Sequence, residues 1–205
     1  MTIYYPDISH YQAGLTIQPA TVAVCAKASE GTTFQDPAYA DFASQAAAQG
    51  SLFFSYHFLH QGNADAQADF CYGIIGATPV MIDCEDPHGT PTVSDCVAFV
   101  HGIRARGGVC TIIYLPHWYW RDHLGSPDLA PFDEAGLNLV SSNYTTYSDT
   151  GPGWDPYGGV TPVIWQYTDN LHYGGHNINM ALLTFPWVVI MRLLGLEGVG
   201  RGRRG

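Results

Sequence analysis

Two carboxylates end a short apolar run near the middle of the chain. The run Met81-Ile82-Asp83-Cys84-Glu85 places Asp83 and Glu85 two residues apart. In a strand, side chains alternate between the two faces, so both carboxylates would point the same way. Two close carboxylates cannot both ionise freely, so the pKa of one should rise. A carboxylic acid that keeps its proton near neutral pH can protonate a leaving oxygen, and a second group can stabilise the positive charge that develops during glycoside hydrolysis.

The same segment allows two other interpretations. Asp86-Pro87 follows the pair, and aspartate is common at helix caps, so the segment could simply begin a helix. Asp86 and His88, with His117 further along, could instead hold a metal ion. No helical HxxxH pair or tight ligand spacing supports that interpretation. The pattern alone leaves catalysis, capping and metal binding open.

Apolar runs alternate with helical patterns along the chain, and this alternation predicts the scaffold that would position these residues. We expect strands at 22–26, 52–58, 79–84, 109–115, 137–141 and 162–167, and helices at 37–49, 63–75 and 93–106. This repetition predicts a parallel sheet with helical crossovers, and the continuously apolar strands predict burial on both faces. We therefore expect a single α/β domain at 1–190, an irregular (β/α) barrel of the TIM type, with a doubly wound open sheet as the alternative. Residues 142–159 are expected to form a long loop over the mouth.

Working residues of a parallel barrel lie at the carboxyl ends of its strands. Those ends carry Asp7, Lys27 with Glu30, Tyr56 with His57, Asp83 with Glu85, Tyr114, Asn143 with Tyr144, and Gln166 with Tyr167. Aromatic residues gather near the same ends, Trp118 among them, and rings with polar tips suit the faces of sugars. Some of these residues are expected to support the fold rather than contact a ligand. We expect Lys27 and Glu30 to form an ion pair, His57 to be buried, and Phe58 and Trp165 to lie in the core.

The composition of the chain limits the classes of molecule that it could bind. The net charge is −10, with four arginines and one acid from residue 192 onward, and four basic and 17 acidic residues before it. An acidic body argues against nucleic acid as the partner. The glycine- and arginine-rich tail, 191–205, is expected to be disordered. The apolar stretch 181–196 is interrupted by Pro186 and Arg192, so we expect a closing strand and helix, or a surface-active tail, rather than a membrane span. The five cysteines include no CxxC pair, which favours free thiols.

Seven segments in chain order resemble the family-25 glycoside hydrolases, lysozymes that cut the β-1,4 bond after N-acetylmuramic acid in bacterial peptidoglycan. They are Asp7-Ile8-Ser9-His10-Tyr11-Gln12, Lys27-Ala28-Ser29-Glu30-Gly31, Asp36-Pro37, Tyr56-His57-Phe58, Ile82-Asp83-Cys84-Glu85, Asn143-Tyr144 and Trp165-Gln166-Tyr167, spanning about 7–180. The resemblance implies an irregular barrel without metal or cofactor. It also implies Glu85 as the acid/base, with Asp83 and Asp7 as supporting carboxylates. The chitinase-like barrels of family 18 carry another acid where this chain has Met81, so they fit less well.

One position departs from the family pattern. The family's last strand usually carries Asp-x-Asn, and Asn177 stands where the aspartate is expected. Asparagine keeps the shape but loses the charge. Two hypotheses follow: a muramidase that uses Glu85, or a catalytically weak barrel that only binds peptidoglycan. The expected substrate contacts are Tyr56, Tyr114, Trp118, Asn143, Tyr144, Gln166, Tyr167 and Asn177.

The biological setting follows from the resemblance and from the first residues. Residues 1–7 show no basic region followed by an apolar core, so we expect no signal peptide. A wall-degrading enzyme of this kind would wait in the host cytoplasm and then reach the wall through a membrane hole, as phage endolysins do. We expect a monomer of phage or prophage origin.

Overall fold

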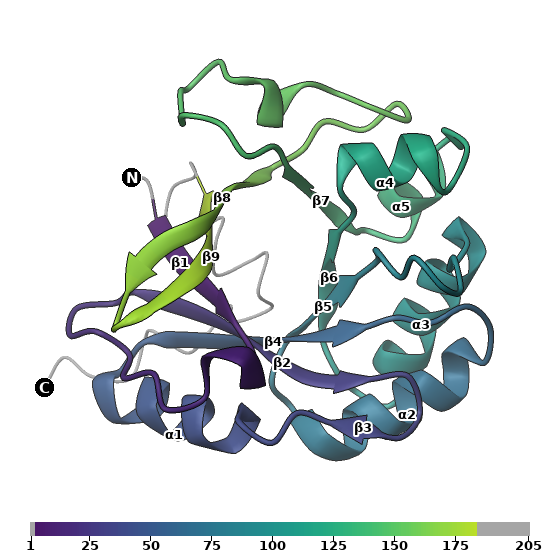
Figure 1. The fold of residues 1–205 in the computed structure, drawn as a ribbon. Coiled ribbons are helices and arrows are strands. Elements are labelled where there is room, and N and C mark those ends of the chain that lie inside the picture. Colours follow the sequence, from purple (N-terminus) through teal and green to yellow (C-terminus); the bar gives the residue numbers. More distant parts are fainter. Residues whose placement is uncertain (1–2, 184–205) are drawn as a thin grey trace, which may run out of the picture.

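The computed structural model describes residues 3–183 and shows a closed barrel of strands with helices around its outside (Figure 1). The strands are β1 (Ile3–Ile8), β2 (Ala23–Glu30), β3 (Phe34–Gln35), β4 (Leu52–Phe58), β5 (Val80–Asp83), β6 (Cys110–Tyr114), β7 (Asn138–Ser142), β8 (Ile164–Tyr173) and β9 (His176–Leu183). Their order in the sheet is β1-β9-β8-β7-β6-β5-β4-β2-β3, and β1 also pairs with β2. That last pairing closes the ring, and β3 lies outside it as an edge partner of β2.

Within the closed ring most neighbouring strands run parallel, and β9 is the exception; outside the ring, β3 pairs antiparallel with β2. From β1 through β2, β4, β5, β6 and β7 to β8, each pair is parallel. Strand β9 pairs antiparallel with both β8 and β1. The prediction of an irregular α/β barrel is confirmed, and the open sheet is excluded by the closure between β1 and β2.

Helices lie on the outside of the barrel (Figure 1). They are α1 (Tyr39–Gln49), α2 (Ala64–Ile75), α3 (Val93–Ala105), α4 (His117–Asp122) and α5 (Ala130–Glu134). The first three are at the predicted places, and the two short ones that follow them, α4 and α5, were not predicted. Local sequence explains their ends. Thr92 and Asp95 form a reciprocal capping box at the start of α3, and α1 ends at Gly50, whose φ of 71° suits glycine. No described helix is long and apolar enough to cross a membrane.

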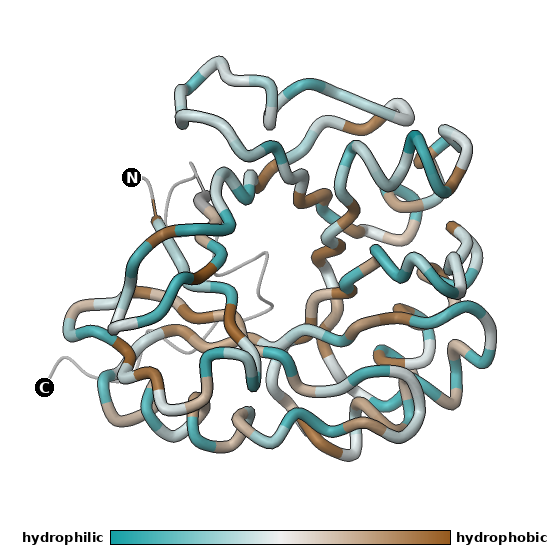
Figure 2. Tube along the Cα trace, viewed as in Figure 1, coloured by the Kyte–Doolittle hydropathy of each residue, from teal (hydrophilic) through white to brown (hydrophobic). Residues whose placement is uncertain are grey.

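The barrel has two apolar layers. The larger one lies between the sheet and the helices and contains residues such as Phe42, Phe99 and Phe132. The smaller one fills the barrel interior with one or two side chains from each strand of the ring: Ile3, Tyr5, Ala23, Cys25, Phe54, Met81, Ile112, Tyr114, Val140, Ile164 and Ala181. Hydrophobic residues follow the strands, while hydrophilic ones recur on the helices outside (Figure 2). Both faces of the strands are therefore buried, as their continuous apolar runs predicted.

Two expectations need correction. Phe58 is not a core residue, because it is only partly buried and lines the clefts at the barrel mouth. The loop between β7 and β8 lies over the mouth only in part: Gly151 and Gly153 pack against the buried Trp165, which faces outward from β8. Trp165 is confirmed as a core residue. Of the apolar stretch 181–196, the first three residues belong to β9, and the rest lies outside the described residues, as does the basic tail.

Candidate active site

A polar layer sits directly above the apolar filling of the barrel. Each of its residues is two positions away from an interior residue on the same strand, so it faces the barrel axis one step nearer the mouth. The layer comprises Asp7, Lys27, Tyr56, Asp83, Gln166 and Asn179, together with Tyr114, which also belongs to the apolar filling. A cleft of about 350 Å³ opens above it, lined by Asp7, Ile8, Ser9, Tyr11, Gln12, Lys27, Tyr56, Phe58, Asp83, Glu85 and Asn179. Asp83 and Glu85 thus share one face, as their spacing predicted.

The three carboxyl groups in this cleft hold protons more tightly than ordinary carboxyls. Burial raises the pKa of Asp7 to about 7, and the charge of Glu85 adds to the rise while a hydrogen bond from Gln166 opposes it. Burial raises the pKa of Glu85 to about 7 as well, against the opposing charge of Lys27. The pKa of Asp83 lies well above its ordinary value, first through burial and then through Glu85 and Asp7. The expected rise is present, but desolvation contributes more to it than mutual repulsion does.

Asp83 also carries an unpaired acceptor. Its Oδ1 atom is buried and has no hydrogen-bond partner among the described residues. A buried acceptor without a donor is unfavourable in a folded protein and is common where a ligand supplies the missing donor. Asp83 is thus poised to accept a hydrogen bond from a molecule in the cleft.

Lys27 supplies the positive charge beside these acids, and it is the only lysine in the chain. Its Nζ lies 2.6 Å from Glu30 Oε2 and 4.9 Å from the centre of the Phe58 ring. The predicted ion pair is therefore confirmed. Lys27 lowers the pKa of both Asp83 and Glu85, so it limits how tightly the carboxyl cluster retains its protons.

Gln166 connects the far side of the barrel to Asp7. Its Nε2 donates to Asp7 Oδ2 at 3.1 Å, and its Oε1 accepts from the hydroxyls of Tyr114 at 3.1 Å and Tyr144 at 2.8 Å. The Gln166 residue is only 2% exposed. Gln166 therefore links the two tyrosine hydroxyls to the Asp7 carboxyl group, and its amide holds Asp7 in place.

The contacts of the segment after Glu85 show what Asp86 does. Asp86 caps no helix: it accepts from His60 Nδ1 at 2.5 Å and from the backbone N–H of His88 at 2.8 Å, while Thr92 caps α3. His60 Nε2 also lies 3.3 Å from Glu30. The described residues contain no group of three or more His, Cys, Asp or Glu side chains arranged to hold a metal.

His57 has the structural role that the sequence suggested. It is fully buried, its Nδ1 lies 2.8 Å from Ser29 Oγ, and its ring stacks on Phe99. Burial lowers the pKa of His57 to about 3, so the imidazole stays neutral. All five cysteines are buried free thiols.

The remaining predicted contact residues divide between the cleft and its surroundings. Tyr56 lines the cleft, and Tyr144 and Tyr167 line a neighbouring pocket. Asn143 holds Trp165 through its backbone carbonyl, at 2.8 Å from the indole Nε1. Trp118 is not brought to the cleft: it is 43% exposed on α4, where its ring contacts Tyr119 and His123.

Asn177 also lies away from the carboxyl cluster. It is exposed on β9, 3.4 Å from His172 Nδ1, whereas Asn179 pairs with Asp7 in the sheet and lines the cleft. The sequence interpretation missed Asn179, Tyr11 and Phe58 as cleft residues. The antiparallel direction of β9 explains Asn179, because the mouth then lies at the amino end of that strand. Tyr11 and Phe58 lie within the segments quoted above, but nothing in their pattern distinguishes a cleft residue from a core or surface residue.

Comparison with known proteins gives a consistent match over this part of the chain. The profile described as "Glycosyl hydrolases family 25" matches residues 6–176. An N,O-diacetylmuramidase of Chalaropsis sp is 28% identical over 196 residues, covering 83% of this chain and 90% of the relative. The fold is similar to that of a family GH25 lysozyme from Aspergillus fumigatus, with a TM-score of 0.76, 24% identity, and coverage of 95% and 99% of the two chains. A muramidase from Trichobolus zukalii superposes with a TM-score of 0.75 at 23% identity, covering 94% and 98%.

Proposed function

Because the chain belongs to family 25 of the glycosyl hydrolases, we propose that it cleaves the β-1,4 bond between N-acetylmuramic acid and N-acetylglucosamine in bacterial peptidoglycan, with Glu85 as general acid and base. It is a glycoside hydrolase, and the curated relatives it matches are N,O-diacetylmuramidases. The observation that carries the proposal is the cluster of Asp7, Asp83 and Glu85 in one cleft with raised pKa values.

Glu85 suits the role of proton donor. With a pKa of about 7, it is substantially protonated near neutral pH, and it can deliver that proton to the glycosidic oxygen as the bond to the sugar C1 breaks. The leaving sugar departs with the proton as a free hydroxyl. Glu85, now ionised, can then take a proton from the water that attacks C1, which restores the starting state.

We infer that Asp83 and Asp7 support the positive charge that develops at C1. Asp83 Oδ1 is the unpaired buried acceptor, and Gln166 fixes the orientation of the Asp7 carboxyl group. In its ionised form, each of these carboxyl groups stabilises an oxocarbenium-like centre that lies opposite it. The group that attacks C1 first is either the substrate's own acetamido oxygen or one of these carboxylates, and both routes use the same Glu85 proton.

The binding residues follow from the same geometry. We assign Tyr56 and Asn179 to sugar contacts because they line the cleft. We add Tyr114 and Tyr144, because their hydroxyls meet at Gln166, which donates to Asp7. Gln166 is a positioning residue, since its amide groups are already engaged by the protein. The alternative of a barrel that only binds peptidoglycan depended on Asn177. That residue is not among those that line the cleft, so the carboxyl cluster is complete although asparagine replaces the aspartate of the family pattern.

The enzyme would act where peptidoglycan is exposed, outside the membrane. Two proteins of similar fold are endolysins: CTP1L, and ply40 from bacteriophage P40 of Listeria monocytogenes. We propose the same setting here: a phage or prophage lysin. Expression in a bacterial host, with and without a membrane-permeabilising holin, tests the setting. Lysis only when the membrane is opened supports it, and lysis without permeabilisation contradicts it.

Analysis of the products tests which glycosidic bond is cleaved. Purified peptidoglycan is digested with the enzyme, the soluble fragments are reduced with borohydride, and their new ends are identified by mass spectrometry. We expect reduced N-acetylmuramic acid at the new ends. Reduced N-acetylglucosamine ends would place the cleavage on the other glycosidic bond and contradict the proposal.

A further inference from the structure

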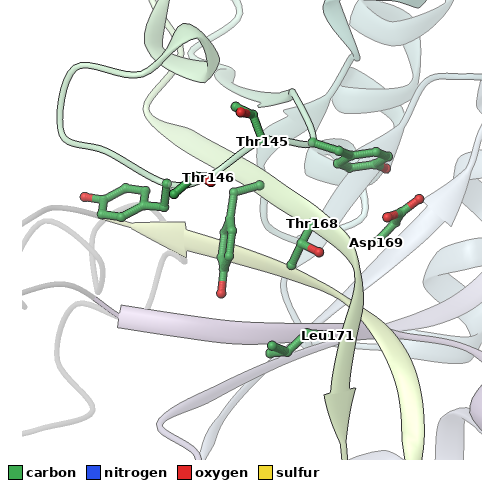
Figure 3. Close-up of a pocket in the computed structure, with 8 residues that line it drawn as sticks. Thr145, Thr146, Thr168, Asp169 and Leu171 are labelled. Carbon is green, nitrogen blue, oxygen red and sulfur yellow. The ribbon is translucent and has the colours of Figure 1, made fainter.

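A second pocket opens on the β7–β8 side of the barrel mouth. We call it the tyrosine pocket: it is lined by Tyr144, Thr145, Thr146, Tyr147, Tyr167, Thr168, Asp169 and Leu171, with a volume of about 470 Å³ (Figure 3). The residues come from the start of the β7–β8 loop and from β8 itself. It shares no lining residue with the cleft that holds Glu85.

The lining has the chemistry of a site for a neutral, hydroxyl-rich molecule. Three tyrosines and Leu171 offer apolar faces, and three threonines offer hydroxyls. Asp169 is the only charged lining residue; it is exposed, and its carboxylate has no hydrogen-bond or ion-pair partner within residues 3–183. An aromatic wall beside an unpaired carboxylate favours a sugar ring, whose C–H face packs on the ring and whose hydroxyls donate to the acid.

Tyr144 connects the tyrosine pocket to the carboxyl cluster. Its hydroxyl donates to Gln166, which in turn donates to Asp7. The charges of Glu85, Asp169 and Asp7 all contribute to raising the pKa of Tyr144 to about 12, after burial as the main cause. Tyr144 therefore stands between the two hollows, close to the acids of both, so one extended ligand can occupy both.

The opposite flank of the mouth differs in character. There a pocket of about 630 Å³ is lined by Tyr11, Lys27, Glu30, Phe58, His60, Gln61, Asp86, Pro87, His88 and Gly89. It is rich in charge, and the charges are paired with one another through His60 and Lys27. A charged group of a ligand matches that flank better than it matches the tyrosine pocket.

We propose that the tyrosine pocket is a saccharide subsite that holds an uncharged sugar unit of the glycan strand next to the unit bound at Glu85, with Asp169 as the acceptor for its hydroxyls. This rests on the proposed function, because it names which part of peptidoglycan the pocket takes. The pocket binds the glycan backbone and not the peptide attached to muramic acid.

Binding measurements test the proposal separately from catalysis. Peptide-free octasaccharides of alternating N-acetylglucosamine and N-acetylmuramic acid are titrated calorimetrically into Glu85→Gln protein, which prevents turnover, and into the same protein carrying Asp169→Ala or Tyr147→Ala. The free stem peptide is the second probe. Asp133→Ala, which removes an exposed carboxylate of α5, is the matched control.

We expect Asp169→Ala to weaken octasaccharide binding about tenfold or more, because a hydrogen bond to a charged acceptor is lost. Tyr147→Ala should also weaken binding, the control should not, and the stem peptide should bind none of the proteins measurably. Unchanged octasaccharide affinity in both pocket variants would overturn the proposal, as would binding of the stem peptide that depends on Asp169. Cleavage of peptidoglycan by the wild type is measured separately. If the wild type cleaves but Asp169→Ala leaves the octasaccharide affinity unchanged, only the saccharide subsite is refuted. If the wild type does not cleave, the proposed function is refuted.

Discussion

Replacing Asp7 by asparagine should stabilise the fold in a pH-dependent way. The carboxyl group of Asp7 has a pKa of about 7 in the folded protein and an ordinary value of 3.8, so folding disfavours its ionised form. Because the folded-state pKa is the higher one, the contribution of Asp7 to stability is intact below pH 4 and is lost as the pH rises to about 7. Asparagine has the same shape and cannot ionise, so the variant escapes this loss.

The size of the effect follows from the pKa values. Each pKa unit corresponds to about 1.4 kcal/mol, so a rise from 3.8 to about 7 gives an upper value of roughly 4 kcal/mol. Water at the open cleft screens the charge, and we expect about 2–4 kcal/mol above pH 8 and almost nothing at pH 3.5. Gln166 Nε2 can still donate to the oxygen of the new amide, which keeps the local geometry.

Urea unfolding at pH 3.5 and pH 8.5 measures this difference. The free energy of unfolding of Asp7→Asn minus that of the wild type should grow between the two pH values, while activity falls. Asp133→Asn, at an exposed position of α5, serves as the control and should show no such growth. An equal difference at both pH values, or a variant less stable than the wild type at pH 8.5, would refute the reasoning about burial of this acid.

Three further expectations concern the acid, the packing and the thiols. The rate of peptidoglycan cleavage should fall above pH 7 as Glu85 ionises. Because Lys27 lowers the pKa of Glu85, the Lys27→Met variant should show this fall at a higher pH. A pH–rate profile that is unchanged in Lys27→Met would contradict this expectation. Gly153→Ala should lower the free energy of unfolding by about 1–3 kcal/mol, since a Cβ there would overlap the buried Trp165 ring, whereas Gly73→Ala in open space on α2 should be neutral or stabilising. The five buried cysteines should resist alkylation by iodoacetamide in the native protein, and rapid native labelling seen by mass spectrometry would show that the barrel opens.

Much of the scaffold could be predicted from the sequence because its strands are apolar on both faces. The run at 52–58 corresponds to β4 without any change of bounds, and the helix at 93–106 differs from α3 by one residue at its end. Such runs are long, regular and bounded by glycine or proline, so the pattern is strong. The pair Asp83 and Glu85 could be found for the same reason, because it follows directly on one of these runs.

The last strands were harder to predict, and the errors at the site follow from them. The stretch from Tyr167 to Asn179 is mostly polar and carries little strand periodicity, so the β8–β9 hairpin is not visible in the pattern. The rule that function gathers at carboxyl ends does not apply to an antiparallel strand, and it therefore gave no reason to expect Asn179 beside Asp7. Asn177 was predicted from the family pattern alone. Trp118 shows a different limit. The sequence places this aromatic residue near a strand end, but it does not predict which way the side chain points from the helix that carries it.

The central claim is that a protonated Glu85 drives cleavage of the glycan. The most direct test measures the release of reducing ends from peptidoglycan at pH 6 by the wild type, by Glu85→Gln and by Glu134→Gln, an exposed glutamate at the end of α5. We predict at least a hundredfold loss for Glu85→Gln, wild-type rates for Glu134→Gln, and unchanged circular dichroism for both. Wild-type rates from folded Glu85→Gln would contradict the account.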